Sequence, residues 1–165
     1  MGMIGCFTAV PPDVQNRLRS DPSLIEDFLF PEDGEGEPEH TIDVDKAWHG
    51  IHFLLNGTAW GGEEPFSLAV LGGEEVGEDF GYGAVRFLFP AQVKLVAQAI
   101  ASMPVSELKK RYIPKSLAAM EIYPDIIWER DGDEALEYLL ENYKELVEFY
   151  KAAAARGDGV LAWIS

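Results

Sequence analysis

The chain has 165 residues, of which 47% are hydrophobic and 12% aromatic, and it carries a formal net charge of −16. This length supplies one hydrophobic core and is too short for two ordinary domains. The single cysteine excludes an internal disulfide framework, and no apolar run approaches the roughly 20 residues of a membrane-spanning helix. The sequence therefore predicts one soluble, cytoplasmic domain.

The negative charge is concentrated in the first half of the chain. Between positions 20 and 85, sixteen acidic residues accompany a single base, Lys46, which gives this stretch a net charge of −15. An acidic surface repels nucleic-acid phosphates and anionic lipid, and it attracts basic partners and cations. We therefore expect neither nucleic acid nor membrane as a partner, and the charge favours a basic protein. The sequence leaves the oligomeric state open.

Proline and glycine positions divide the chain into short predicted elements. Prolines that suit the first turn of a helix stand at positions 12, 22, 90 and 114, and Gly157 suits a helix end. Apolar residues recur at helical spacing most clearly in the last predicted helix. The predicted helices cover residues 12–19, 22–30, 44–56, 90–103, 106–111, 114–121 and 134–156, and the predicted strands cover 2–10, 84–89 and 160–164.

Two acid-rich, glycine-containing stretches separate these elements. We expect residues 31–40 to form a mobile acidic loop that includes His40, and residues 74–79 to form a second acidic loop. Helices then alternate with few, short, apolar strands, which predicts a single α/β or α+β domain over residues 1–165. Its helices are expected to lie on a small central mixed sheet, as a three-layer sandwich.

The helix expected after Asp43, its N-terminal cap, carries the most distinctive polar side chains. At about 100° per residue, Asp45, His49 and His52 fall within roughly 60° of one another and away from the apolar face. An aspartate and two histidines on one stripe could bind a metal ion with open coordination positions. A solvated helix surface is the favoured interpretation, because the spacing matches no metalloprotease helix. We therefore predict no metal and no other cofactor, and these three side chains remain weak metal candidates.

A glycine-rich segment over residues 72–83 is the second candidate. Its acidic side chains would repel a phosphate, and no Gly-Lys-Ser/Thr sequence is present, so a nucleotide site is disfavoured. A structural turn is the plainer interpretation, with Arg86 paired to Asp79. The predicted ligand site combines side chains of this segment and of the helix: Trp48, His49, His52, Asp79, Tyr82 and Arg86.

The single cysteine, Cys6, lies in the first predicted strand among apolar neighbours. No nearby residue would lower the pKa of its thiol, so we expect a core residue rather than a nucleophile. A nucleophilic role would require His49 or His52 to fold against it.

Several of these segments together resemble the signature of the YfbM-like bacterial family. The similar segments are Asp43-Val44-Asp45-Lys46-Ala47-Trp48-His49-Gly50-Ile51-His52-Phe53-Leu54-Leu55 with Gly57, Leu71-Gly72-Gly73 through Val76-Gly77, Asp79-x-Gly81-Tyr82-Gly83-x-x-Arg86, Pro90 with Val93, and the terminal helix with Tyr143 and Phe149-Tyr150. The resemblance covers nearly the whole chain. It implies a single cytoplasmic domain with helices layered on a sheet, in a family whose biochemical function is unassigned, and it transfers no catalytic residue.

Two functions have support in the sequence, and a purely structural or oligomeric role stays open without any positive signal. The first is a non-enzymatic binding protein, comparable to an inhibitor or immunity protein, that engages a basic protein through the acidic half. This function is preferred because no complete catalytic set is evident. The alternative is a small-molecule or metal-dependent enzyme with its site between the 45–52 helix and the 79–86 segment.

Overall fold

The computed structural model describes residues 2–36 and 38–165. Its helices are α1 (Pro12–Ser20), α2 (Ile25–Leu29), α3 (Trp48–Asn56), α4 (Pro90–Ser102), α5 (Val105–Arg111), α6 (Pro114–Ala119), α7 (Ile127–Asp131) and α8 (Asp133–Arg156). Its strands are β1 (Gly5–Val10), β2 (His40–Asp43), β3 (Glu74–Asp79), β4 (Ala84–Leu88) and β5 (Gly159–Ile164). Of the helices in these two ranges, none combines the length and apolar character that crossing a membrane requires.

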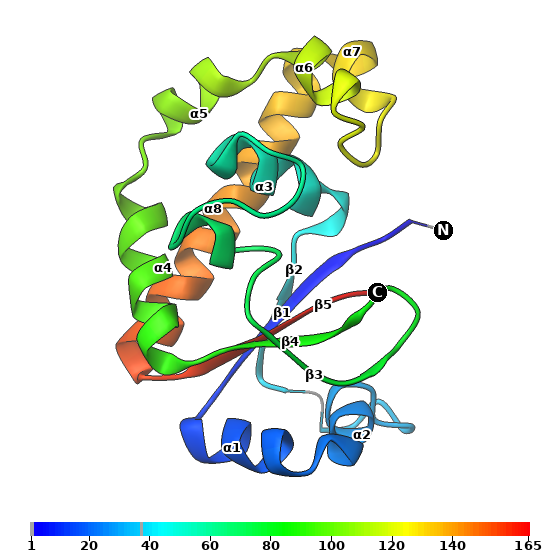
Figure 1. Ribbon diagram of the computed structural model, residues 1–165, viewed down its shortest axis with the longest axis vertical. Coiled ribbons are helices and arrows are strands. Elements are labelled where there is room, and N and C mark those ends of the chain that lie inside the picture. The colour runs from blue at the N-terminus through cyan, green and yellow to red at the C-terminus, as the bar shows by residue number, and fades with distance from the viewer. Residues whose placement is uncertain (1, 37) are drawn as a thin grey trace.

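These strands form one sheet in the order β2-β1-β5-β4-β3, and each neighbouring pair is antiparallel. The expectation of a mixed sheet is therefore wrong. Helices between strands suggest parallel crossovers, but β5 enters the sheet between β1 and β4 and runs in the opposite direction to both. The first and last strands thus lie side by side near the middle of the molecule, as Figure 1 shows.

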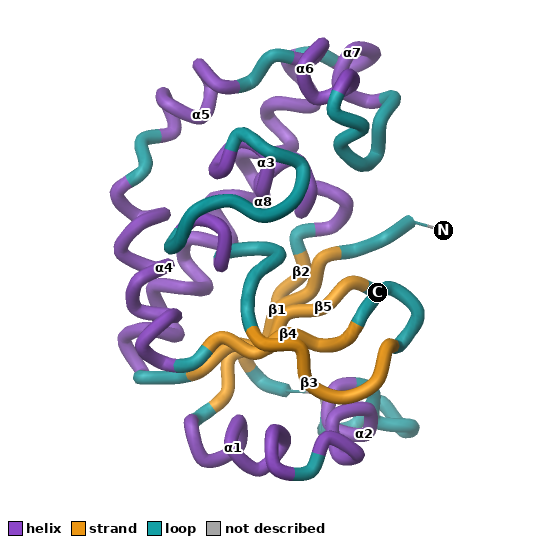
Figure 2. The backbone as a smooth tube through the Cα atoms, in the orientation of Figure 1, coloured by secondary structure: helices purple, strands orange, loops and turns teal. Residues whose placement is uncertain are grey.

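The sheet separates two hydrophobic cores, which gives the molecule three layers (Figure 1 and Figure 2). Side chains of β1 alternate between the faces: Phe7 and Ala9 join the larger core, beneath α3 to α8, whereas Val10 joins the smaller core, beneath α1 and α2. In β5, Leu161 and Trp163 likewise face the smaller core. The predicted class, one domain with helices layered on a small sheet, is confirmed, and its antiparallel sheet makes it α+β.

The sequence does not predict either edge strand, and both adjoin or replace a predicted acidic loop. β2 begins at His40, at the end of the predicted loop 31–40, and β3 coincides with the predicted loop 74–79. The side chains of both strands are mostly exposed, and Val76 is the one buried residue of β3. Charged residues on an exposed edge also prevent pairing with other chains. An edge strand and a solvated loop can therefore have the same composition.

Between α2 and β2 the described residues form tight turns. Gly34 adopts a left-handed conformation with a φ of 68°, and Oδ1 of Asp33 accepts the N–H of Glu35 at 3.1 Å. Glu37 lies outside the described residues. The mobility expected of residues 31–40 stays a prediction.

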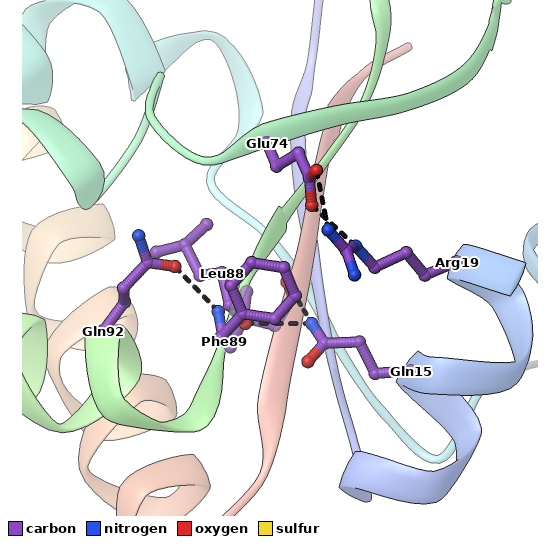
Figure 3. Close-up of polar contacts among 7 residues, drawn as sticks. Gln15, Arg19, Glu74, Leu88, Phe89 and Gln92 are labelled. Carbon is purple, nitrogen blue, oxygen red and sulfur yellow. Dashed lines mark hydrogen bonds and ion pairs between the residues drawn. The ribbon is translucent and has the colours of Figure 1, made fainter.

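A polar cluster fixes α1 against the end of the sheet (Figure 3). Gln15 is 1% exposed, and its Nε2 donates to the carbonyl oxygens of Leu88 at 2.9 Å and Val160 at 3.4 Å. One turn later, Nε of Arg19 lies 2.8 Å from Oε2 of Glu74 in an exposed ion pair. The buried amide of Gln15 therefore ties α1 to β4 and β5, and the ion pair of Arg19 ties it to β3.

Replacing Gln15 with leucine is expected to lower the free energy of unfolding by about 2 kcal/mol. The variant removes the donor and leaves the buried Leu88 carbonyl without its partner, a loss that costs about 1–3 kcal/mol. Urea denaturation measures the difference from the wild type. Arg19→Leu is the control, because an exposed ion pair contributes little to stability. Equal losses in the two variants would contradict the prediction.

Candidate functional site

A pocket of about 530 Å³ opens on the side of the sheet that α3 covers. Its volume lies within the range of small-ligand sites, about 300–1,000 Å³. The lining comes from the start of α3, the β3–β4 hairpin, the loops that follow α3 and α6, and the two chain ends beside the sheet. Segments far apart in the sequence therefore meet at this pocket.

The pocket brings together four of the six predicted ligand residues. Trp48 and His49 come from the first turn of α3, Tyr82 from the turn between β3 and β4, and Arg86 from β4. The other two, His52 and Asp79, do not belong to the lining. The 45–52 helix and the 79–86 segment thus meet at the pocket, and each contributes two of its three predicted ligand residues.

Aromatic rings from three segments stack along the pocket. The Trp48 indole lies 4.9 Å from the His49 ring with an interplanar angle of 12°, and 5.7 Å from the Tyr123 ring at 24°. The Trp60 ring lies 4.6 Å from His49, and Trp60 is 65% exposed. Nε1 of Trp48 donates to the Met3 carbonyl at 2.9 Å, which fixes the central indole. Aromatic faces attract cations, because they carry the negative part of the ring quadrupole.

Both ring nitrogens of His49 bond to the backbone. Nδ1 accepts the N–H of Tyr123 at 2.9 Å, so Nε2 carries the proton and donates to the Ala59 carbonyl at 2.9 Å. Burial lowers the pKa of His49, although the Ala59 carbonyl opposes the shift. His49 is therefore a neutral ring that ties two distant loops to α3, and it has no free lone pair for a metal or a proton.

The predicted solvated stripe of Asp45, His49 and His52 is wrong. The two histidines are 2% and 0% exposed, and every residue from Trp48 to Leu55 is buried, so α3 has no solvated face over these residues. Asp45 lies in a 3-10 turn before α3 and accepts the Tyr138 hydroxyl at 2.7 Å. Among residues 2–36 and 38–165, no three His, Cys, Asp or Glu side chains are grouped to hold a metal ion. The three weak metal candidates are therefore not brought together.

Asp43 does not cap α3 as expected. It ends β2, and its Oδ1 accepts the N–H of Asp45 at 3.0 Å in a tight turn. α3 begins only at Trp48 and ends at Asn56, and Gly57 caps it in a left-handed conformation with a φ of 72°. The predicted C-terminal end of this helix is confirmed, because glycine accepts that conformation without strain.

The turn between β3 and β4 presents Tyr82 to the pocket. Oδ1 of Asp79 accepts the N–H groups of Gly81 at 2.6 Å and Gly83 at 3.0 Å. Both glycines have positive φ, 116° and 99°, which suits a tight turn closed by an aspartate. Tyr82 lies between them and is 55% exposed. Asp79 therefore shapes the turn, and Tyr82 is the side chain of this turn that meets the pocket.

Arg86 is a buried cation at the pocket. It is 9% exposed, and its Nη1 donates to the carbonyl oxygens of Val70 at 2.7 Å and Gly72 at 3.4 Å. Burial lowers the pKa of its guanidinium. The expected ion pair with Asp79 is absent from the described part of the chain. Arg86 instead fixes the segment that leads into β3.

Sequence reasoning did not identify the carboxylates of the pocket. Glu75 comes from β3, and Glu121 and Asp125 come from the segment between α6 and α7. These three acids and the single Arg86 give the pocket lining a formal net charge of −2. Of these three acids, only Glu75 lies in the acidic first half of the sequence. The other two acids lie in the half whose charge is nearly balanced, so only the fold reveals their role.

Cys6 lies outside the pocket lining, and burial together with the Asp43 carboxylate raises the pKa of its thiol from 9.0 to about 11. We expect iodoacetamide to alkylate Cys6 in the native protein roughly 10- to 100-fold more slowly than in the urea-unfolded chain, because the thiolate is the nucleophile. Mass spectrometry of timed, quenched samples at neutral pH measures the two rates. Similar rates in the two states would contradict the prediction.

These features define a small α+β domain with an aromatic pocket that carries negative charge. The chain matches the family described as "Domain of unknown function (DUF1877)" over residues 1–163, and it belongs to that family. Protein YfbM of Escherichia coli strain K12 is 26% identical to it over 170 residues, which cover 99% of each chain. The crystal structure of YfbM, described as a protein of unknown function, matches with a TM-score of 0.77 and 27% identity, covering 98% of this chain and 99% of that one. The resemblance to the YfbM-like family is confirmed.

Proposed function

We propose that the protein is a non-enzymatic binding protein, which engages a basic protein partner through the pocket and the acidic surface of the first half of the chain. The observation that carries this proposal is the convergence of Glu75, Glu121 and Asp125 on a pocket with exposed aromatic rings. Surface charge attracts a partner of opposite sign and accelerates its association. A single cysteine, which offers no internal disulfide, supports a cytoplasmic location for this function.

The exposed aromatic side chains support the same proposal. Trp60 and Tyr82 are 65% and 55% exposed. At protein interfaces, a few tryptophan, tyrosine and arginine side chains supply most of the binding energy once the partner covers them. Coverage of these two rings would also remove apolar surface from water, which stabilises a complex.

A fluorescein-labelled peptide of alternating arginine and lysine residues is the probe that tests this function. We expect saturable binding to the wild-type protein in fluorescence anisotropy. In the Glu75→Lys/Asp125→Lys variant the affinity should fall by at least about tenfold. Both acids are exposed, so their replacement is compatible with folding. Circular dichroism of each variant checks that it is folded.

The control for net charge is a variant with the same two charge reversals on the exposed face of α8, Glu141→Lys/Glu145→Lys, since neither residue lines the pocket. This variant should bind the peptide as the wild type does. Equal weakening in the two double variants would mean that the peptide senses only the overall charge. That result, or a wild type that does not bind, would overturn the proposal.

A small-molecule or metal-dependent enzyme at the same pocket is the second candidate. The meeting of Trp48 and His49 with Tyr82 and Arg86 favours it. Against it, a histidine acts as a general base only through a ring nitrogen with a free lone pair, whereas both nitrogens of His49 bond to the backbone. Zinc, nickel and iron analysis of the purified, untagged protein separates the two functions. Near-stoichiometric metal that is lost from a His49→Ala/His52→Ala variant would favour the enzyme.

A further inference from the structure

We infer that the pocket recognises the guanidinium group of an arginine side chain that belongs to the basic partner. This inference rests on the proposed function, because it names the chemical group by which the partner is held. Three features of the pocket carry it: a supported aromatic face, carboxylates on separate segments, and apolar side chains that suit an alkyl stem.

Trp60 supplies the aromatic face. Its ring lies 4.6 Å from the His49 ring at an interplanar angle of 37°, and 65% of the residue is exposed. His49 is itself stacked on Trp48 and fixed by two backbone hydrogen bonds, so Trp60 rests on a rigid support. A guanidinium is planar and weakly hydrated, and it stacks on such a face. The ammonium of lysine is a compact and strongly hydrated charge, which gains less there.

The carboxylates supply the acceptors. Glu75 lies on β3, whereas Glu121 and Asp125 lie on the loop between α6 and α7. A guanidinium presents five N–H donors in a fixed fork, so it can pair with more than one carboxylate while it stacks on a ring. The lysine ammonium has three donors on one rotating nitrogen, so it matches a ring face flanked by carboxylates less well than the planar guanidinium does.

Arg86 does not convert the pocket into an anion site. Its Nη1 already donates to the Val70 and Gly72 carbonyls, and 9% of the residue is exposed. With three acids against this one base, a positive group is attracted and an anion is repelled.

Apolar side chains complete the pocket. Met3, Leu71 and Ile164 contribute to the lining, and the methylene groups of an arginine pack favourably on such surface. The volume of about 530 Å³ also admits the backbone on either side of the arginine. Tyr82, in the β3–β4 turn, adds a second exposed ring to the lining.

Two capped peptides test the inference, one with three Arg-Gly repeats and one with three Lys-Gly repeats. By isothermal titration calorimetry we expect the arginine peptide to bind the wild-type protein about tenfold more tightly than the lysine peptide. Trp60→Ala should reduce this preference to less than about twofold, because it removes the stacking face. Leu95→Ala, at an exposed apolar position of α4 outside the pocket lining, is the matched control and should retain the preference.

Each other outcome overturns a defined part of the inference. Equal affinity for the two peptides in the wild type would refute guanidinium recognition and leave the proposed binding of basic partners standing. No binding of either peptide would refute both. A preference that survives Trp60→Ala would refute this pocket as its source. Agmatine, a small guanidine, binding as tightly as the arginine peptide would assign the site to a small molecule and refute the protein partner.

Discussion

Acid is expected to destabilise this protein by about 3 kcal/mol between pH 6.5 and pH 4 through one buried histidine, His52. Burial lowers the pKa of His52 from 6.5 to about 4; the Gly61 carbonyl opposes this shift, and the neighbouring His49 and Arg86 add to it. Its Nε2 is buried without a hydrogen-bond partner among the described residues. Nothing in the described surroundings therefore favours the charged form of this ring strongly enough to offset its burial.

The direction follows from the lowered pKa of a base. The unfolded chain takes up a proton on His52 near pH 6.5, whereas the folded protein takes it up only near pH 4. A falling pH therefore favours the unfolded state throughout this window, and the loss levels off below pH 4. His49, whose pKa burial also lowers, contributes in the same direction.

His52→Leu removes the titrating group from a fully buried position. Free energies of unfolding from urea titrations at the two ends of the window give the result: the wild type should lose about 3 kcal/mol more than this variant. Taking the difference between the two proteins cancels the contribution of the carboxylates, which titrate in both. His40→Gln, at an exposed position of β2, should behave as the wild type does. Equal acid losses in the wild type and His52→Leu would contradict the prediction.

Elements with local signals could be predicted from the sequence. α4 and α8 begin and end close to the predicted positions. Pro90 starts α4, and Gly157, with a φ of 75°, caps the end of α8. The sheet order and the two charged edge strands could not be predicted. Their stability comes from pairing with β1 and β4, and the composition of a segment does not reveal which strand it pairs with.

The candidate site shows the same division between local and distant information. Grouping the polar residues by motif identified four side chains of the pocket, yet the helical-stripe argument put His52 on a solvated surface. That argument assumes a helix with one exposed face, whereas α3 is buried all round from Trp48 to Leu55. Trp60 and Tyr123 join the aromatic stack through contacts and hydrogen bonds with His49 that no sequence period reveals.

The tight burial of α3 leads to the second prediction of large effect. Gly50→Val is expected to lower the free energy of unfolding by about 3 kcal/mol, at the upper end of the usual cost of overpacking. A Cβ at this position would lie 2.6 Å from Cδ2 of Leu139 and 2.8 Å from Cη2 of Trp128, and both side chains are fully buried. Urea denaturation measures the loss. Ala152→Val, at an exposed position of α8, controls for the lower helix propensity of valine and should cost less than about 1 kcal/mol.

A double-mutant cycle identifies the clash as the cause. Gly50→Ala alone should destabilise the protein. In a Leu139→Ala background the same added methyl group should cost less, because the clash with Leu139 is gone and only the 2.8 Å approach to Trp128 remains. The coupling free energy between the two sites should therefore exceed about 1 kcal/mol, and additive losses would refute the clash. Because Gly50 directly follows His49, a displaced α3 also shifts the ring that supports Trp60. Affinity for the arginine peptide should accordingly fall in Gly50→Ala and recover in part in the double variant, which would link the packing of this helix to the function of the pocket.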